Sequence, residues 1–297
     1  MKRLNLGKLY YEISKDNPPA IRINPGETLV VETEDAFSGQ IRKEGDRRDT
    51  QTMPHGNPQS GPIYVDGAER GDTLSVYIVD IKPLIGQAAT RTAGPGMLAD
   101  YLGKDVPHGT RICPIRDGKV WWSDKITIPY EPMIGTIGAA PEEKVTTGPA
   151  GPYGGNMDIK EVTIGNTLYL PVFVPGALLH LGDVHAAQGD GELCGTALEM
   201  PAECVITVDL SKNKTIFAPR IESPKELMTI ATGRPMEVSV AKAYADMILW
   251  LENDYGFYRW DAYNLLTQVG RLSIGYFGIG TVAVKFPKQY LDFGKLK

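Results

Sequence analysis

Residues 111–122, RICPIRDGKVWW, contain the pattern that decides the fold class of this chain. Asp117 and Gly118 separate two short runs, 111–115 and 119–122, which are rich in β-branched and aromatic residues. An Asp-Gly pair favours a two-residue hairpin turn, because both central positions of that turn need a positive φ angle. The segment therefore predicts two antiparallel strands joined by a tight turn.

The same succession of short runs and turn residues continues through most of residues 1–220. Turn dipeptides stand at Pro25-Gly26, Asp66-Gly67 and Gly165-Asn166. Several short strands at this spacing are typical of a β-sandwich or a β-barrel. Besides the hairpin, the strands expected from the pattern are 27–33, 62–65, 74–81, 161–164, 167–174 and 203–210.

Helical signals appear only in the last third of the chain. Residues 223–226, Ser-Pro-Lys-Glu, form a capping box with proline at the first helical position, and they predict a helix that ends near Gly233. Apolar residues at helical spacing predict a longer helix over about 237–254, with Gly256 as its C-terminal cap. A third helix is expected over about 260–269.

The last strands are expected from Leu272 to Phe286. Together these patterns predict an α+β fold that is predominantly β. Its core should be an antiparallel sandwich-like or barrel-like structure, with a few helices in the C-terminal third. A β-rich subregion over 1–220 and a helix-containing subregion over 221–297 are expected.

Composition excludes several classes of function. The chain has 297 residues and a net charge of -5, with 42% hydrophobic and 23% charged residues, which is ordinary for a globular protein of one or two domains. It has no cluster of basic residues, so neither nucleic-acid binding nor attachment to a membrane is expected. Three cysteines fit a reducing compartment, and the first residues, MKRLNLGK, lack the apolar core of a secretory signal. We therefore expect a cytoplasmic protein.

Acidic residues concentrate in one segment. Residues 161–211 contain seven acids and no Lys or Arg. Neighbouring carboxylates repel one another unless a metal ion or shared protons neutralise them, so such a segment favours a cation site. His180, Asp183 and His185 are the candidate ligands, because a His/His/Asp set is a common shell for a catalytic zinc-type ion.

Strand geometry gives a partial test of this ligand set. A strand would place Asp183 and His185 on one face and His180 on the other, unless a bulge at Gly182 turns His180 toward them. The alternative is that both histidines are core residues whose hydrogen bonds are satisfied within the protein.

Further candidates lie around this segment. Glu199 stands among apolar residues, where burial would raise the pKa of its carboxyl and suit it to proton transfer, or it faces outward from a strand. The run 188–192, QGDGE, presents carboxylates to an ion or forms a solvated turn. Gly154 and Gly155 permit close approach of the backbone to a ligand or form a plain connection, and Asn156 beside them could hold a carbonyl or amide group.

Further candidate functional residues lie outside these motifs. Asp35 could add a carboxylate from far away in the sequence, although surface acids are common. No Gly-x-Ser-x-Gly motif is present, so Cys194 and Cys204 are the candidate nucleophiles, although a small buried hydrophobic residue is the more typical role for each.

Three stretches carry a resemblance to a known family: 61–72 (GPIYVDGAERGD), 151–158 (GPYGGNMD) and 180–192 (HLGDVHAAQGDGE). The sequence resembles the acetamidase/formamidase family over nearly its whole length, most sharply from about 148 to 201. The resemblance implies that residues 1–297 form a single catalytic unit that hydrolyses short linear amides, such as formamide or acetamide, to a carboxylate and ammonia. It also implies a β-rich cytoplasmic enzyme, a homodimer or higher homo-oligomer, and a divalent metal, zinc and/or calcium.

The resemblance and the residue patterns together give an expected site. Its metal ligands are His180, Asp183 and His185, with Asp35 as a further candidate, and its proton-transfer residue is Glu199 or Asp190. The expected substrate-binding residues are Gly154, Gly155, Asn156, Gln188 and Glu192. Cysteine-dependent amide hydrolysis and a non-enzymatic cation-binding β module are the alternatives. The tail 273–280, SIGYFGIG, is less typical of the family and is expected to affect oligomer contacts or the mouth of the pocket.

Overall fold

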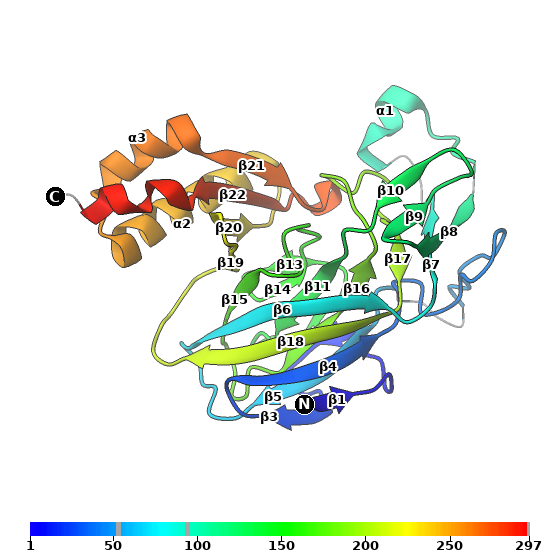
Figure 1. The fold of residues 1–297 in the computed structure, drawn as a ribbon, viewed down its shortest axis with the longest axis horizontal. Helices are drawn as coiled ribbons and strands as arrows, with labels where there is room; N and C mark the ends of the chain where they lie inside the picture. Colours follow the sequence, from blue (N-terminus) through cyan, green and yellow to red (C-terminus); the bar gives the residue numbers. More distant parts are fainter. Residues whose placement is uncertain (52–54, 93–95, 108, 296–297) are drawn as a thin grey trace.

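The computed structural model describes residues 1–51, 55–92, 96–107 and 109–295, and its largest feature is a pair of facing β-sheets (Figure 1). In the described chain, the first sheet has nine strands in the order β1-β4-β18-β6-β15-β19-β20-β22-β21. Their bounds are β1 (Lys2–Leu4), β4 (Glu27–Thr33), β6 (Thr73–Pro83), β15 (Thr167–Pro171), β18 (Ala202–Ser211), β19 (Arg220–Glu222), β20 (Glu226–Ala231), β21 (Arg271–Ile274) and β22 (Val282–Pro287).

The second sheet has eleven strands among the same residues. Its main path is β10-β9-β8-β7-β17-β16-β11-β14-β13, while β5 pairs with both β16 and β3. The bounds are β3 (Ile21–Ile23), β5 (Gln59–Val65), β7 (Gln87–Arg91), β8 (Thr110–Arg116), β9 (Lys119–Trp121), β10 (Thr127–Pro129), β11 (Met133–Ala139), β13 (Ala150–Gly151), β14 (Gly154–Asn156), β16 (Leu179–His185) and β17 (Glu199–Met200). A separate pair joins β2 (Glu12–Ile13) to β12 (Val145–Thr146).

The main hydrophobic core lies between the two sheets. Leu29, Val76 and Ile206 from the first sheet pack in one buried cluster with Ile134 and Leu181 from the second. Neither strand order closes on itself, so the core is a sandwich rather than a closed barrel. The predicted α+β fold with a predominantly β, antiparallel core is thus confirmed.

The hairpin predicted around Asp117 and Gly118 is present. Strands β8 and β9 pair through Ile115–Val120 and Arg116–Lys119, and Asp117 and Gly118 have φ angles of 53° and 68°. Both values are positive, as the Asp-Gly pair predicts. The predicted strands 27–33, 74–81 and 203–210 form β4, β6 and β18, which lie next to one another in the first sheet.

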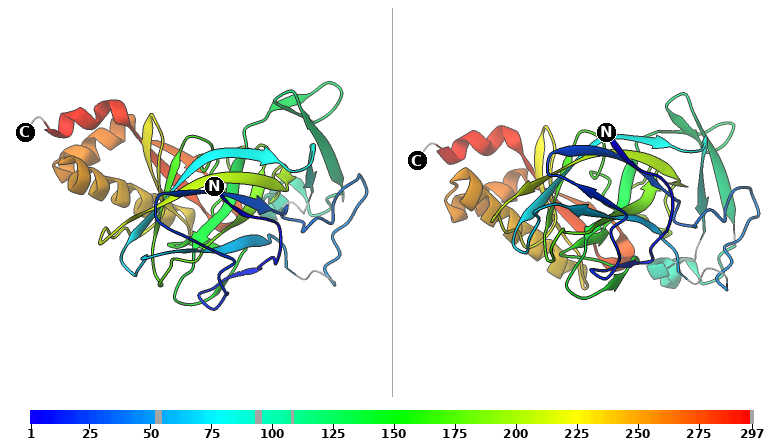
Figure 2. Two further views of the ribbon diagram at one scale, coloured as in Figure 1. Left: turned by 60° about the horizontal axis from the view of Figure 1, so that its bottom comes forward. Right: turned by 90° about the horizontal axis from the view of Figure 1, so that it is seen from below.

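The two long helices lie at the C-terminal end, as Figures 1 and 2 show from three directions. Helix α2 (Met236–Tyr255) ends at Gly256, whose φ of 73° is the left-handed cap conformation, and α3 (Arg259–Val269) follows it. Short helical segments are α1 (Ala99–Leu102), η1 (Gly96–Leu98), η2 (Phe277–Ile279) and η3 (Lys288–Lys295). None of the helices in the described ranges combines the length and the apolar character needed to cross a membrane.

The prediction of a helix from the capping box at 223–226 is wrong. Residues on both sides of Ser223 form β19 and β20, which pair with each other, and β20 also pairs with β22. The Ser223 hydroxyl accepts hydrogen bonds from the N–H groups of Lys225 (3.2 Å) and Glu226 (2.9 Å). A Ser side chain caps a turn in the same way that it caps a helix, and the burial of β20 between two strands decides between them.

The expected hairpin around Gly165-Asn166 is only partly present. Residues 167–171 form β15, but 161–164 form no strand, and only Thr163 makes an isolated bridge, to Met133. Glu161 instead accepts a hydrogen bond on its carbonyl from the Asn166 side chain (2.9 Å), which makes the segment a compact turn.

Candidate active site

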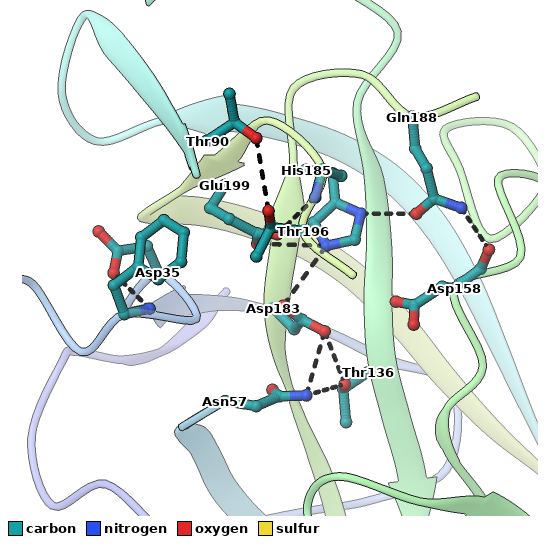
Figure 3. A network of polar contacts seen from close by, with 12 residues as sticks. Asp35, Asn57, Thr90, Thr136, Asp158, Asp183, His185, Gln188, Thr196 and Glu199 are labelled. Carbon is teal, nitrogen blue, oxygen red and sulfur yellow. Dashed lines mark hydrogen bonds and ion pairs between the residues drawn. The ribbon is translucent and has the colours of Figure 1, made fainter. Parts of the chain in front are cut away.

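Strand β16 positions the first site residues at the centre of the second sheet. It lies between β11 and β17, and His185 is directly opposite Met133 on one side and Glu199 on the other. Residues opposite each other in a strand pair share a face, so this register brings the His185 and Glu199 side chains together. Asp183 has a φ of 56°, and its side chain turns toward His185, as Figure 3 shows.

Four carboxyl groups and one imidazole gather there, which we call the carboxylate cluster: Asp158, Asp183, His185, Glu192 and Glu199. One ligand atom each from Asp158, Asp183 and His185 lies within 4.8 Å of the others, and the same holds for His185, Glu192 and Glu199. The His185 Nε2 atom lies 3.2 Å from Glu199 Oε2 and 3.4 Å from Asp183 Oδ1. All five residues are buried.

Gln188 fixes the orientation of His185. The Gln188 Nε2 atom donates to the Asp158 carbonyl (2.7 Å), so the Gln188 Oε1 atom faces His185 Nδ1 at 2.8 Å. An amide oxygen only accepts, and His185 Nδ1 therefore carries the proton in this network. The other nitrogen, Nε2, is left to face the carboxylates, which is the arrangement that outer hydrogen bonds give to metal-binding histidines.

A second network holds Asp183. Its Oδ2 atom accepts hydrogen bonds from Thr136 Oγ1 (3.0 Å) and Asn57 Nδ2 (3.1 Å). The same two donors also reach Asn156 Oδ1, at 2.5 Å from Thr136 and 2.7 Å from Asn57. Because the oxygen of Asn156 is held in this way, its amide nitrogen remains for other acceptors.

Four buried carboxyl groups surround a single imidazole in the cluster, and their pKa values are shifted accordingly. Burial, together with Glu192 and Asp183, raises the pKa of Asp158 well above its ordinary value. Burial also raises the pKa of Glu192 to about 8 and that of Glu199 to about 7. Burial alone would lower the pKa of His185, but the Glu199 and Asp183 carboxylates outweigh it and raise that pKa.

This donor set fits a divalent cation. Both carboxylate oxygens of Asp158 and the Oε2 atom of Glu199 are buried without a hydrogen-bond partner among the described residues. Unpaired buried carboxylates are costly unless protonated or bound to a metal. Oxygen ligands with one imidazole suit hard or borderline divalent ions, and several such ions meet that description.

A pocket of about 530 Å³ opens onto the cluster. Asp183, Glu192 and Glu199 contribute to its wall, whereas Asp158 and His185 lie behind it. Arg48, Arg91, Asn156 and Tyr276 also line this pocket.

The structure does not bring every expected residue to the cluster. His180 Nδ1 donates to the Leu178 carbonyl (2.9 Å), and His180 Nε2 accepts from Asn17 Nδ2 (3.1 Å). The register between β16 and β11 is regular across Gly182, and the irregularity that β16 does contain lies between Leu179 and Leu181 in its pairing with β5. It does not bring His180 to the cluster, so His180 keeps a separate environment. Burial lowers the pKa of this histidine to about 4.

Two expected carboxylates also lie apart from the cluster. Asp35 accepts from the N–H groups of Phe37 (2.9 Å) and Gly39 (3.0 Å) and pairs with Arg42, to one side in Figure 3. Asp190 is about half exposed, at 48%, and pairs with Lys160 at 2.9 Å.

Gly154 and Gly155 serve the sheet rather than the pocket wall. Strand β14 lies so close to its neighbours that a β-carbon at Gly154 would come within 2.4 Å of the Ile137 carbonyl oxygen. At Gly155 the corresponding distance to the Pro149 carbonyl oxygen is 2.7 Å. Asn156, which follows them, does line the pocket, and Glu192 does as well, whereas Gln188 lies behind His185.

The sequence pattern did not predict several of the site residues. Asp158 stands in the GPYGGNMD stretch, but without a second carboxylate beside it in sequence nothing marks it as a ligand. Asn57 and Thr136 meet Asp183 only through the fold. Tyr276 lies in the tail that was expected to affect the pocket mouth, and it does line the pocket.

The two candidate cysteine nucleophiles lie in environments that do not activate a thiol. Cys204 is fully buried in the sandwich core, and burial raises the pKa of its thiol to about 12. The Cys194 thiol donates to the Thr196 carbonyl (3.2 Å). A thiol acts as a nucleophile in its deprotonated form, which burial disfavours at Cys204.

Comparison with known proteins places this site in a family. The chain matches the Acetamidase/Formamidase family over residues 9–148 and 132–274. Crystal structures of acetamidases from Yersinia enterocolitica (38% identity, TM-score 0.92) and Bacillus halodurans (34% identity, TM-score 0.91) have the same fold. The first covers 98% of this chain and 92% of its own, and the second 98% and 99%.

A curated acetamidase of Mycolicibacterium smegmatis is 31% identical over 266 residues, covering 66% of this chain and 64% of that protein. The chain thus spans slightly less than two thirds of the length of the curated relatives that it matches. The family match over most of the chain, with the motifs that form the carboxylate cluster inside it, shows that this protein belongs to the acetamidase/formamidase family.

Proposed function

We propose that this protein hydrolyses the C–N bond of short linear amides, such as formamide or acetamide, to a carboxylate and ammonia. The observation that carries the proposal is the buried carboxylate cluster at the base of a pocket, in a chain of the acetamidase/formamidase family. An amide is a poor electrophile, so its hydrolysis needs an activated water and a proton for the leaving nitrogen. The cluster has groups for both tasks.

Asp158, Asp183 and His185 would hold a divalent cation, for which zinc and calcium are the first candidates. When bound, such an ion supplies Lewis-acid chemistry, because it lowers the pKa of a coordinated water and polarises a carbonyl. Hydrogen bonds within the protein already orient two of these ligands. Gln188 turns His185 Nε2 toward the carboxylates, and Thr136 with Asn57 holds Asp183.

Glu199 takes the proton from water and delivers it to the leaving nitrogen. It lines the pocket, its Oε1 atom is held by the Ala197 N–H (2.8 Å), and its Oε2 atom accepts no hydrogen bond from the described residues. The Asn156 amide nitrogen donates to the substrate carbonyl, where negative charge develops. Removing one such donor typically costs about 3 kcal/mol of transition-state stabilisation.

Ammonia release from formamide and acetamide tests this assignment directly. Glu199→Gln should lower kcat by about 10²- to 10⁴-fold, the usual contribution of a general base. Asp190→Asn is the matched control, because Asp190 is the other carboxylate that the sequence offers for proton transfer, but it is half exposed and paired with Lys160. Equal activity of both variants would remove Glu199 from the mechanism, and no turnover of any amide by the unmodified protein would contradict the function.

The broader expectations belong to the same proposal. We propose that the chain acts as one catalytic unit, in the cytoplasm, and as a homodimer or larger homo-oligomer. Light scattering of the purified protein at several concentrations measures the last of these, and a concentration-independent monomer mass would contradict it.

A further inference from the structure

The pocket above the carboxylate cluster also has a cationic wall. Arg48 and Arg91 line the same pocket as Asp183, Glu192 and Glu199. The cavity is therefore bipolar, with carboxylates in one part of its wall and two guanidinium groups in another. The chemistry of amide hydrolysis accounts for the carboxylates but has no evident use for two arginines.

Sheet geometry places Arg91 beside the reactive groups. Strand β7 pairs with β17 through Ala89 and Glu199, so these two residues share a face of the sheet. Arg91 is two residues further along β7, and alternate residues of a strand project from the same face. Two strand residues span about 7 Å, so Arg91 leaves the backbone at about that distance from the position opposite Glu199.

Arg48 reaches the pocket from the loop that connects β4 to β5. Its guanidinium packs against the backbone of Gly56, where a β-carbon would lie 2.9 Å from Arg48 Nη1. Gly56 precedes Asn57, whose amide holds Asp183, so this arginine is anchored next to the cluster. Burial lowers the pKa of Arg48, and the nearby charge of Arg91 lowers it further.

The charge of Arg91 is not neutralised within the described residues. No carboxylate there forms an ion pair with it, and its guanidinium lies 5.8 Å from the centre of the Phe37 ring. Two guanidinium groups that line one pocket favour an anion there, because guanidinium groups match the geometry of a carboxylate.

The size of the cavity also favours a ligand that carries a second group besides its amide. A volume of about 530 Å³ lies in the range that accommodates ligands much larger than formamide or acetamide, which have only a few non-hydrogen atoms. A substrate that places its amide at the cluster therefore leaves room for a second group at the arginines.

We infer that the preferred substrate is an amide whose acyl chain ends in a carboxylate, that is, the monoamide of a short dicarboxylic acid. The inference rests on the proposed function and specifies its substrate class. The amide C–N bond breaks, a C–O bond forms with the oxygen of water, and the nitrogen leaves with water's proton as ammonia. Arg48 and Arg91 hold the distal carboxylate, which takes no part in the reaction.

Pairs of isosteric substrates isolate the effect of charge. Malonamate is compared with malonamide, and succinamate with succinamide, by kcat/KM for ammonia release from the purified protein, with acetamide alongside. In each pair the charged member should be preferred by about tenfold or more, since hydrogen bonds to charged groups are the stronger class. Arg91→Gln should bring the charged-to-neutral ratio close to one, and Arg91→Lys should retain part of it.

Arg116→Gln is the matched control. Arg116 lies on β8, stacked over Trp121 at 4.2 Å, and does not line the pocket, so its removal should leave every ratio unchanged. If acetamide is hydrolysed but the neutral member of each pair is preferred, the inference is overturned while the amidase function stands.

A binding measurement separates failure of the inference from failure of the function. Calorimetric titration with succinamate needs no turnover. If no amide is hydrolysed yet succinamate binds and Arg91→Gln abolishes the binding, the anion site stands and the amidase function falls. If succinamate is neither bound nor hydrolysed, or if Arg91→Gln leaves its binding unchanged, the inference is overturned.

Discussion

Gln188 determines which nitrogen of His185 faces the carboxylates, and it does so through two hydrogen bonds behind the pocket. The sequence motif suggested contact with substrate, whereas the contacts favour a positioning role. Gln188→Leu removes both bonds and frees the imidazole to rotate. We expect metal affinity to fall by about 10- to 100-fold, as for other outer hydrogen-bond partners of metal ligands.

Competition with a chromophoric chelator measures that affinity, and Asp190→Asn again serves as the control. Undiminished metal binding by Gln188→Leu would show that the imidazole is oriented by other contacts.

His180 makes acid stability depend on one buried side chain. Burial holds its pKa at about 4, so the folded state keeps it neutral while the unfolded state is protonated below about 6.5. The unfolded state therefore binds more protons in this window, and stability falls as the pH drops from about 6.5 to about 4. A shift of this size corresponds to about 3 kcal/mol.

Urea unfolding at pH 7 and pH 4.5 tests this pH dependence. His180→Gln should lose less stability between the two pH values than the unmodified protein. Parallel losses in the two proteins would show that His180 does not contribute.

At the scale of the element, β11 must come close to β16 for the cluster to form. Gly135 permits this approach, because a β-carbon there would lie 2.7 Å from the Asp183 carbonyl oxygen, 2.6 Å from Asp158 Oδ1 and 2.9 Å from His185 Cε1. Gly135→Ala should therefore displace both side chains and destabilise the fold by about 1–3 kcal/mol, the usual cost of overpacking.

Gly189→Ala is the comparison, since a β-carbon at Gly189 meets nothing within 4 Å. Thermal unfolding and ammonia release are measured for both variants. A Gly135→Ala protein with normal stability and turnover would contradict the packing argument.

The individual elements also differ in how well the sequence alone predicts them. Elements specified by local chemistry, such as the Asp117-Gly118 hairpin and the helix capped by Gly256, are predicted correctly. Ser223 carries a local signal that a helix and a turn share, and the pairing of β20 with β22 selects the turn. Asp158 joins the cluster through contacts between segments far apart in sequence, so no local pattern could have identified it.

At the scale of the whole molecule, a partly buried ion pair joins the helical region to the sandwich. Arg220 on β19 contacts Asp246 on α2 at 2.6 Å and lies 4.8 Å from the centre of the Trp250 ring. Arg220→Ala leaves Asp246, whose side chain is 13% exposed, without its ion-pair partner and should cost about 1–3 kcal/mol.

The exposed pair between Arg259 and Glu252 is the control, and Arg259→Ala should cost less than about 1 kcal/mol. Denaturant unfolding gives both free energies. Similar values for the two variants would show that the helical region does not depend on Arg220.

The central claim is that the carboxylate cluster hydrolyses amides with a bound divalent cation. The most direct test is ammonia release from acetamide by the purified protein, before chelation, after chelation and after zinc, calcium or manganese is restored. Our account predicts activity that disappears on chelation and returns with one of these ions. Turnover that persists in protein shown to be free of metal would contradict it.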